Sequence, residues 1–295
     1  MIKIKDLDPK NPLGNFESAG FQASKIAKAV EIIKEMKENN STIFFGFTAN
    51  MMASGLRGLF TELAKRKFID VVITSGGSID HDLIRSYSDY YLGDFDFDDN
   101  ILHKKGLNRI GNILVPNERY ILLEKKMKPI FKKFGNAAVS PSQLIEKIGS
   151  SIKNENSFLY WCSKNKIPVF SPGITDSAIG LQTYFFKGAY PNFAIDVTGD
   201  MRELASLCLN CEKTGGIILG GGITKHHIIG LNLLRGGLDY AVYLTTSSES
   251  DGSLSGARTR EGISWGKIKE KSKHITIDCE ATVAFPLVFN YLFSK

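Results

Sequence analysis

The chain has 295 residues, of which 43% are hydrophobic and 23% charged, the balance of a globular protein large enough for a full core. Its formal net charge of +6 comes from basic residues scattered among amphipathic segments, so neither DNA nor RNA is favoured as a ligand. No run of about 18 apolar residues occurs and the first segment, MIKIKDLDPKNP, is charged, so we expect no signal peptide, no membrane association and a cytoplasmic location.

Short apolar runs that end in small or polar residues alternate with amphipathic segments along most of the chain. The predicted strands cover residues 41–47, 68–77, 167–173, 215–222, 239–246 and 274–280. Helices are predicted at 48–66, 78–91, 174–186, 223–237 and 281–293. Continuously apolar strands separated by helices are typical of a parallel sheet that is covered on both faces. We therefore predict a doubly wound, Rossmann-like α/β fold with a mostly parallel sheet.

Residues 91–156 interrupt this alternation and look irregular and charged. They contain one clear helical pattern, NERYILLEKKMKPIFKKF at 117–134, and no low-complexity linker flanks them. We expect a single domain over residues 1–295, with residues 91–156 as an insertion in it.

The CLNC segment places two of the four cysteines, Cys208 and Cys211, in a segment with a helical pattern. No second cysteine pair and no cluster of histidines lies near it in the sequence, so small apolar thiols on a helix face explain the pair better than a metal or redox site does. We expect no bound metal and reduced thiols.

Polar and small residues gather where the predicted strands end. They are Thr48, Asn50, Thr74, Ser75, Gly76, Gly77, Asp176, Gly220, Gly221, Gly222, Thr245, Thr246 and Glu280. In a parallel sheet these carboxyl ends meet at one edge, which is where such folds bind ligands. Two glycine-rich ends and an acid suggest a dinucleotide, but the ordered GxGxxG pattern is absent and tight turns also need glycine, so both explanations stay open.

Two further segments hold residue types that carry chemistry. KHH at 225–227 opens a helix after the triple glycine, and a helix start disfavours a charged imidazole, as a general base requires. In REGISWGKI, Lys267 follows the polar loop 247–262 and has Trp265 and Ile268 as neighbours. A lysine attacks carbon only when uncharged, and apolar walls favour that form. A surface lysine held over the tryptophan ring is the alternative.

The block GGGITKHHIIGLNLLRGGLDYAVYLTTSSESDGSLSGARTREGISWGKI, residues 220–268, closely resembles the deoxyhypusine synthase family. The resemblance extends through SPGITDSAIG, GLNRIGNILVPNERY, VVITSGG and FFGFTANMMASGLR, and so covers nearly the whole chain. It implies an enzyme that uses NAD to oxidise spermidine, releases 1,3-diaminopropane and holds the butylamine fragment as an imine on a lysine. The fragment then passes to a lysine of translation initiation factor five-A, and the hydride is returned. The resemblance also implies a homotetramer with active sites between paired subunits.

Carried over by position, the resemblance makes Lys267 the nucleophile and His226, or its neighbour His227, the base. It places Trp265 along the alkyl chain and Glu261 at a terminal ammonium, with Gly252 and Ser253 at the substrate end. The implied NAD site consists of Thr48, Asn50, Thr74, Ser75, Gly76, Asp176, Gly220, Gly221, Thr246, Ser247, Glu280 and Ala281.

The match departs from the family at three places. Leu181 and Leu254 stand where eukaryotic members have acids that contact the substrate. The turn SGGSIDHDL is also one residue longer, which leaves open whether Asp80, His81 or Asp82 contacts substrate there; we assign His81. Two other functions stay open: aminobutyl transfer to a small diamine such as putrescine, as in homospermidine synthesis, and a catalytically silent NAD-binding subunit.

Overall fold

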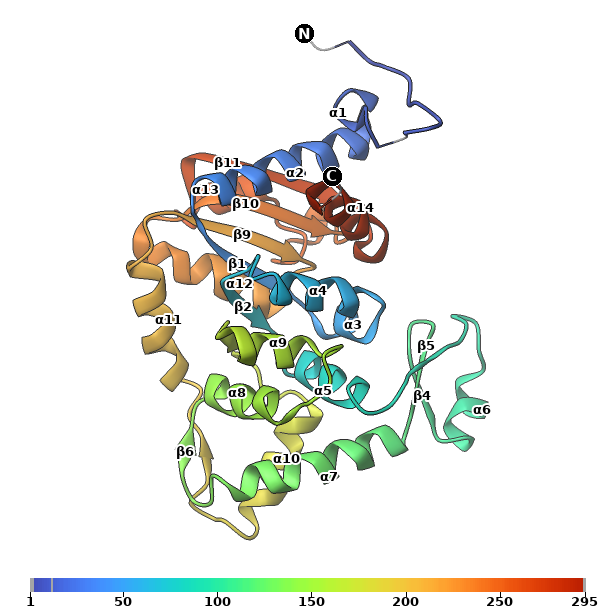
Figure 1. Cartoon of the computed structure of the whole chain (residues 1–295), viewed down its shortest axis with the longest axis vertical. Helices are drawn as coiled ribbons and strands as arrows, with labels where there is room; N and C mark the ends of the chain where they lie inside the picture. The colour runs from blue at the N-terminus through green and yellow to red at the C-terminus, as the bar shows by residue number, and fades with distance from the viewer. Residues whose placement is uncertain (1–2, 12, 294–295) are drawn as a thin grey trace. The chain divides into compact units, whose positions relative to one another are not determined.

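A computed structural model describes residues 3–11 and 13–293, and these form two compact units (Figure 1). The first unit is built from the segment that ends at residue 47, from residues 69–73 and from the chain after residue 202. The second unit comprises residues 48–68 and 74–202. The prediction of a single domain stays a prediction.

Parallel strands form the core of the first unit, in the order β11, β10, β9, β1. β9 and β10 are almost entirely buried, as their continuous Ile, Leu, Val and Tyr content requires. The strands are β1 (Thr42–Phe47), β9 (Thr214–Leu219), β10 (Leu238–Thr245) and β11 (Ile268–Asp278), and β2 (Val71–Thr74) follows β1 in the sheet order.

Helices cover both faces of this sheet. A side chain at Gly215 would meet Met36 of helix α2 (Phe21–Glu38), whereas one at Gly216 would meet Ile228 of helix α12 (Gly222–Asn232). Because consecutive strand residues point to opposite faces, α2 and α12 lie on opposite sides. Helix α14 (Ala281–Phe293) packs beside α2, and α13 (Thr259–Ser264) packs against β10 and β11. The predicted doubly wound α/β architecture is thus confirmed (Figure 1).

The second unit is mostly helical. Its helices are α3 (Ala49–Ala53), α4 (Leu56–Lys65), α5 (Gly76–Arg85), α6 (Asp99–Lys104), α7 (Glu118–Lys132), α8 (Pro141–Ser151), α9 (Phe158–Asn165) and α10 (Ala178–Lys187). Its strands are β3 (Tyr91–Leu92), β4 (Leu107–Ile110), β5 (Ile113–Pro116), β6 (Ala138–Val139), β7 (Val169–Phe170) and β8 (Ala194–Ile195). Helix α11 (Gly199–Leu209) begins in this unit and ends in the first.

Residues 91–156 form regular structure for much of their length. The helical pattern at 117–134 corresponds to α7, and β3, β5 and β4 make a small antiparallel sheet. Helix α8 starts with a capping box in which Ser140 and Gln143 satisfy each other's backbone N–H groups.

A buried carboxylate links three helices of the second unit. Asp82 of α5 accepts hydrogen bonds from the backbone N–H groups of Phe158 and Leu159 at the start of α9, and from the Ser157 hydroxyl. Its other partner is the Arg57 guanidinium of α4, 2.7 Å away, and the Asp82 side chain is fully buried. Helix starts leave N–H groups without partners, so this one carboxylate satisfies several buried donors at once.

Replacing Asp82 with alanine leaves a buried guanidinium without its counter-charge and two N–H groups at the start of α9 without their acceptor. We expect Asp82→Ala to lower the free energy of unfolding by about 3–5 kcal/mol, measured by urea denaturation. Asp99→Ala breaks the exposed pair with Arg109 and serves as the control, with a far smaller loss expected. Equal losses in the two variants would contradict the linking role of Asp82.

Candidate active site in the first unit

The triple glycine forms the turn between β9 and α12. Gly220 and Gly222 have positive φ angles, of 81° and 63°, which favour glycine. Position 221 has no room for a side chain, because a Cβ there would lie 2.5 Å from the Ser255 Cα. The Gly222 N–H also donates to the Ser255 hydroxyl at 2.9 Å. The turn therefore holds loop 247–258 close to the start of α12.

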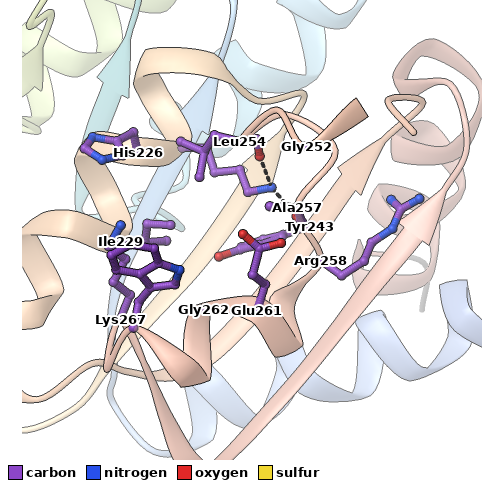
Figure 2. Close-up of a pocket in the computed structure, with 12 residues that line it drawn as sticks. His226, Ile229, Tyr243, Gly252, Leu254, Ala257, Arg258, Glu261, Gly262 and Lys267 are labelled. Carbon is purple, nitrogen blue, oxygen red and sulfur yellow. Dashed lines mark hydrogen bonds between the residues drawn. The ribbon is translucent and has the colours of Figure 1, made fainter. Parts of the chain in front are cut away.

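A pocket of about 280 Å³ opens beside this turn (Figure 2). It is lined by Lys225, His226, Ile229, Tyr243, Gly252, Leu254, Ala257, Arg258, Glu261, Gly262, Trp265 and Lys267. These residues come from α12, β10, the loop after β10, and α13 with the turn that follows it. Both proposed catalytic residues, Lys267 and His226, lie in this one pocket.

Backbone pairing fixes Lys267 at the start of β11. Its N–H donates to the Gly262 carbonyl and its carbonyl accepts from the Leu238 N–H, at 2.9 and 3.0 Å. The half-buried side chain places Nζ 5.0 Å from the centroid of the exposed Trp265 ring. The lysine–tryptophan contact considered as the alternative is therefore present, and the same lysine also faces the pocket.

The pocket includes the first of the two adjacent histidines. His226 is exposed on the first turns of α12 and lines the pocket, whereas His227 does not line it. This placement favours His226 as the imidazole that meets a ligand.

Lys225 is a pocket residue that the sequence analysis did not assign. Its side chain is 1% exposed, and Nζ donates to the carbonyl of Leu254 at 2.7 Å and to that of Ala257. Nζ also lies 4.5 Å from the centroid of the Tyr243 ring. Burial lowers the pKa of Lys225 to about 8, and Glu261 opposes this while Arg258 adds to it. The sequence does hold a clue to its burial. Lys225 lies three and four residues before Ile228 and Ile229, which places it on the same, buried face of α12.

Tyr243 was also missed, because a tyrosine in an apolar strand is usually core. Its ring is 1% exposed, and its hydroxyl has no hydrogen-bond partner among the residues that the structure describes. Burial, and then the charge of Glu261, raise the pKa of Tyr243 far above neutral pH. The phenol thus stays protonated, with its hydrogen-bonding capacity unused.

Glu261 is the one carboxylate among the residues that line the pocket, and it is exposed. The other charge of the wall, Arg258, pairs with Asp278 at 2.6 Å. Leu254 lines the pocket with its side chain and carries the carbonyl that Lys225 binds. Gly252 lines the pocket, and its neighbour Ser253 does not. The pocket thus has one exposed carboxylate and one buried ammonium.

His81 lies in the second unit. Its Nδ1 is 2.8 Å from the Tyr90 hydroxyl, and burial together with Arg85 lowers the pKa of His81 to about 4. Asp80 accepts from the N–H groups of Ala178 and Ile179 at the start of α10, and burial raises the pKa of Asp80 to about 7. Both acids of this turn, Asp80 and Asp82, are therefore engaged with helix starts.

The residues assigned to NAD are divided between the units. Gly220, Gly221, Thr246, Ser247, Glu280 and Ala281 follow β9, β10 and β11, whose parallel pairing puts these carboxyl ends at one edge. Thr48, Asn50, Thr74, Ser75, Gly76 and Asp176 belong to the second unit.

Two features of the first-unit group suit a dinucleotide. A side chain at Gly222 would meet no atom within 4 Å, so the start of α12 is open, and helix-start N–H groups suit a phosphate. Glu280 accepts from the Thr282 N–H at 2.8 Å, so its carboxylate is held facing the start of α14. An anchored acid and an open helix start are compatible with a ribose and a phosphate.

No group of three or more metal-ligating side chains occurs in residues 3–11 and 13–293. Cys208 is buried with Sγ 3.6 Å from the Leu231 carbonyl, and burial raises the pKa of its thiol to about 11. Cys208 therefore packs against the end of α12 as an inert thiol. In the same described ranges, no helix is both long and apolar enough to span a bilayer.

Comparison with known proteins identifies one family. The family model for deoxyhypusine synthase matches residues 13–292. A "Probable deoxyhypusine synthase" of Picrophilus torridus is 43% identical over 97% of this chain and 95% of its own length. The deoxyhypusine synthase of Senecio vernalis is 41% identical over 96% of this chain and 85% of its own. The solved structure of "a putative deoxyhypusine synthase from Entamoeba histolytica" aligns with a TM-score of 0.71 and 25% identity, over 99% of this chain and 97% of that one.

The close approach of loop 247–258 to the glycine turn leads to a stability prediction. Gly221→Ala forces a Cβ against Ser255, so we expect it to lower the free energy of unfolding by about 1–3 kcal/mol. Gly230 lies in α12 with no atom within 4 Å of an added Cβ, so the matched Gly230→Ala is expected to raise it by about 0.5–1 kcal/mol. Denaturant titration measures both, and a neutral Gly221→Ala would show that the loop does not depend on this contact.

Proposed function

Because the chain belongs to the deoxyhypusine synthase family, we propose that it transfers the aminobutyl group of spermidine, through an imine on Lys267, to a lysine of translation initiation factor five-A. Enzymes of this family are transferases of the aminobutyl group. The observation that carries the assignment of residues is the single pocket in which Lys267, His226, Trp265 and Glu261 meet.

The cofactor of the proposed reaction is NAD, which supplies the acceptor for a hydride from the carbon next to the secondary nitrogen. The residues assigned to NAD in each unit stay proposed contacts of this cofactor. His226 takes the proton that the amine must lose before its lone pair can form the carbon–nitrogen double bond. Lys267 then attacks that carbon, the bond to the departing nitrogen breaks, and 1,3-diaminopropane leaves.

The pocket walls suit the rest of a polyamine. Glu261 provides a counter-charge for a terminal ammonium, and the exposed Trp265 ring provides an apolar and cation-binding surface for the alkyl chain. Because Glu261 is exposed, its pairing with the ammonium has a modest strength that depends on how far the bound amine excludes water. Gly252 leaves room at the loop end, and Ser253 and His81 stay proposed contacts of the substrate.

Leu254 bears on which amine the pocket takes. Its apolar side chain stands in the pocket wall, where eukaryotic members have an acid, and Leu181 is another such replacement. Each lost charge-assisted hydrogen bond is worth roughly 1.5–3 kcal/mol. An amine with fewer charges than spermidine suits this wall better, and aminobutyl transfer to putrescine stays the alternative that the family resemblance leaves open. Retention of Lys267 and His226 in the pocket disfavours a silent NAD-binding subunit.

The same proposal places the protein in the cytosol as a homotetramer. Family members assemble this way, with active sites between paired subunits. Supplying either the factor protein or putrescine as the sole acceptor separates the two candidate functions.

We expect Lys267→Arg to bind NAD as the wild type does and to lose transfer by at least about a thousandfold, because a guanidinium cannot form the imine. Fluorescence titration of NADH gives the binding, and transfer of labelled aminobutyl from spermidine gives the activity. Lys269→Arg, two residues along β11, is the control and keeps its activity. Undiminished turnover by Lys267→Arg would remove the nucleophile assignment.

His226→Ala is expected to slow amine oxidation by about a hundredfold or more while NAD affinity changes little, because only the proton acceptor is lost. Single-turnover appearance of NADH absorbance reports the oxidation step. His227→Ala is the matched control, since His227 does not line the pocket. Losses of the same size in rate and NAD affinity would indicate a structural role for His226.

A further inference from the structure

The pocket has a polarity that the proposed reaction does not by itself explain. Its carboxylate, Glu261, is exposed, whereas its most buried groups are the Lys225 ammonium and the Tyr243 phenol. A polyamine carries positive charge on several nitrogens, so a fixed ammonium at the buried end is unfavourable for a fully protonated substrate. The arrangement instead suits a ligand that is charged at one end and neutral further in.

Lys225 cannot easily move out of this position. Two of its three donors are used by the carbonyls of Leu254 and Ala257, and the ammonium lies over the Tyr243 ring. Its pKa of about 8 leaves it mostly charged at pH 7. It is therefore a fixed positive charge in the pocket wall.

Tyr243 contributes a hydroxyl whose hydrogen-bonding capacity is unused. It lines the pocket, its hydroxyl is buried and has no partner in the described part of the chain, and its ring lies under the Lys225 ammonium. Leaving a buried hydroxyl without a hydrogen bond costs about 1–3 kcal/mol, so a ligand that supplies the partner recovers this energy. In Figure 2 the Tyr243 phenol and the Glu261 carboxylate lie together in the middle of the site.

We propose that Lys225 and Tyr243 form the inner subsite of the pocket, where the Tyr243 hydroxyl hydrogen-bonds the secondary nitrogen of the amine and the positive charge of Lys225 raises the fraction of that nitrogen that is unprotonated. This inference rests on the proposed function, because an amine is oxidised only when its nitrogen lone pair is free. Tyr243 is then a substrate-binding residue. Lys225 acts on the substrate through its charge, and His226 receives the proton that this charge makes easier to lose.

The distances indicate that the charge of Lys225 can measurably change the protonation of a bound amine. The Tyr243 ring centroid is 4.5 Å from Lys225 Nζ. An amine nitrogen that is hydrogen-bonded to the phenol oxygen therefore lies within about 10 Å of the ammonium. With an effective dielectric constant of about 20, a unit charge at that range changes the ratio of neutral to charged amine by about tenfold. The other charged or titratable groups of the pocket are Glu261, Arg258, Lys267 and His226. Glu261 acts in the opposite sense, but it is exposed and holds the terminal ammonium.

Proton release on amine binding tests the inference directly. Spermidine and homospermidine are titrated into the protein near pH 7 in buffers of different ionisation enthalpy, with NADH present because it cannot accept a hydride. Calorimetry then gives the number of protons released per amine bound. We expect protons to be released by wild type and by Lys225→Arg, which keeps the charge and cannot lose a proton. For Lys225→Met we expect the ratio of neutral to charged bound amine to be about tenfold lower, so that far fewer protons are released.

Tyr243→Phe separates the hydroxyl from the charge. We expect it to weaken amine binding by about three- to tenfold and to leave proton release unchanged. Melting temperatures of all three variants show that each is folded in the titration. The Lys225→Arg variant also identifies the proton: if release disappears in it, the proton came from Lys225 itself and the inference is overturned.

Other outcomes overturn the inference without touching the family reaction. Amine binding by wild type with no proton release contradicts the neutral nitrogen, and unchanged affinity in Tyr243→Phe contradicts the hydrogen bond. Failure of wild type to bind either amine overturns the subsite as well. Loss of the proposed function would be seen elsewhere, as the absence of an amine adduct on Lys267.

Discussion

Parallel pairing of β9, β10 and β11 is the constraint on which the site depends. The register aligns Leu244 of β10 with Leu219 of β9, and Thr245 with Asp278 of β11, so that all three strands end at one edge. At the opposite end, the Leu238 N–H binds the Lys267 carbonyl and fixes the lysine where β11 begins. The same sheet positions Tyr243 and the two helices that carry His226 and Glu261. A slip of one residue would turn Tyr243 away from the pocket face.

The charged side chain of Lys225 holds the pocket wall together beside this sheet. The buried ammonium of Lys225 ties together two carbonyls of the loop after β10, which brings Leu254 and Ala257 into the wall. Ser255, between them, closes on the glycine turn. Loop 247–258 is thus held from two sides although its residues are mostly polar. The result is a cavity with a buried ammonium, Lys225, and an exposed carboxylate, Glu261, in its wall.

Much of the fold could be predicted from the sequence, because buried parallel strands are continuously apolar. The strands expected at 41–47, 215–222 and 239–246 correspond to β1, β9 and β10, and the helix at 281–293 matches α14. The first half of β11 was missed, since IKEKSK is mostly charged, as edge strands often are. The antiparallel sheet of β3, β5 and β4 was also missed, because its strands are only two to four residues long.

Only some residues of the candidate site could be predicted from the sequence. Residue types that stand out from their surroundings, such as Lys267 beside Trp265 and the paired histidines, pointed to the pocket. Lys225 and Tyr243 did not stand out, because the roles proposed for them rest on burial and on a hydroxyl without a partner among the described residues, which only a three-dimensional arrangement shows. The two acids of the turn at 80–82 stood out in the sequence but are not free to bind a ligand in the same way. They look available in the sequence, but Asp80 and Asp82 satisfy the starts of α10 and α9.

The most direct test of the account is to trap the intermediate. The protein is incubated with NAD and, separately, with spermidine, putrescine, homospermidine or agmatine, reduced with borohydride and measured by intact mass spectrometry with peptide mapping. An aminobutyl adduct on Lys267 from spermidine is the result the account predicts. An adduct on another residue, or none from any amine, would contradict it, and an adduct on Lys267 from a different amine alone would keep the mechanism and replace the substrate.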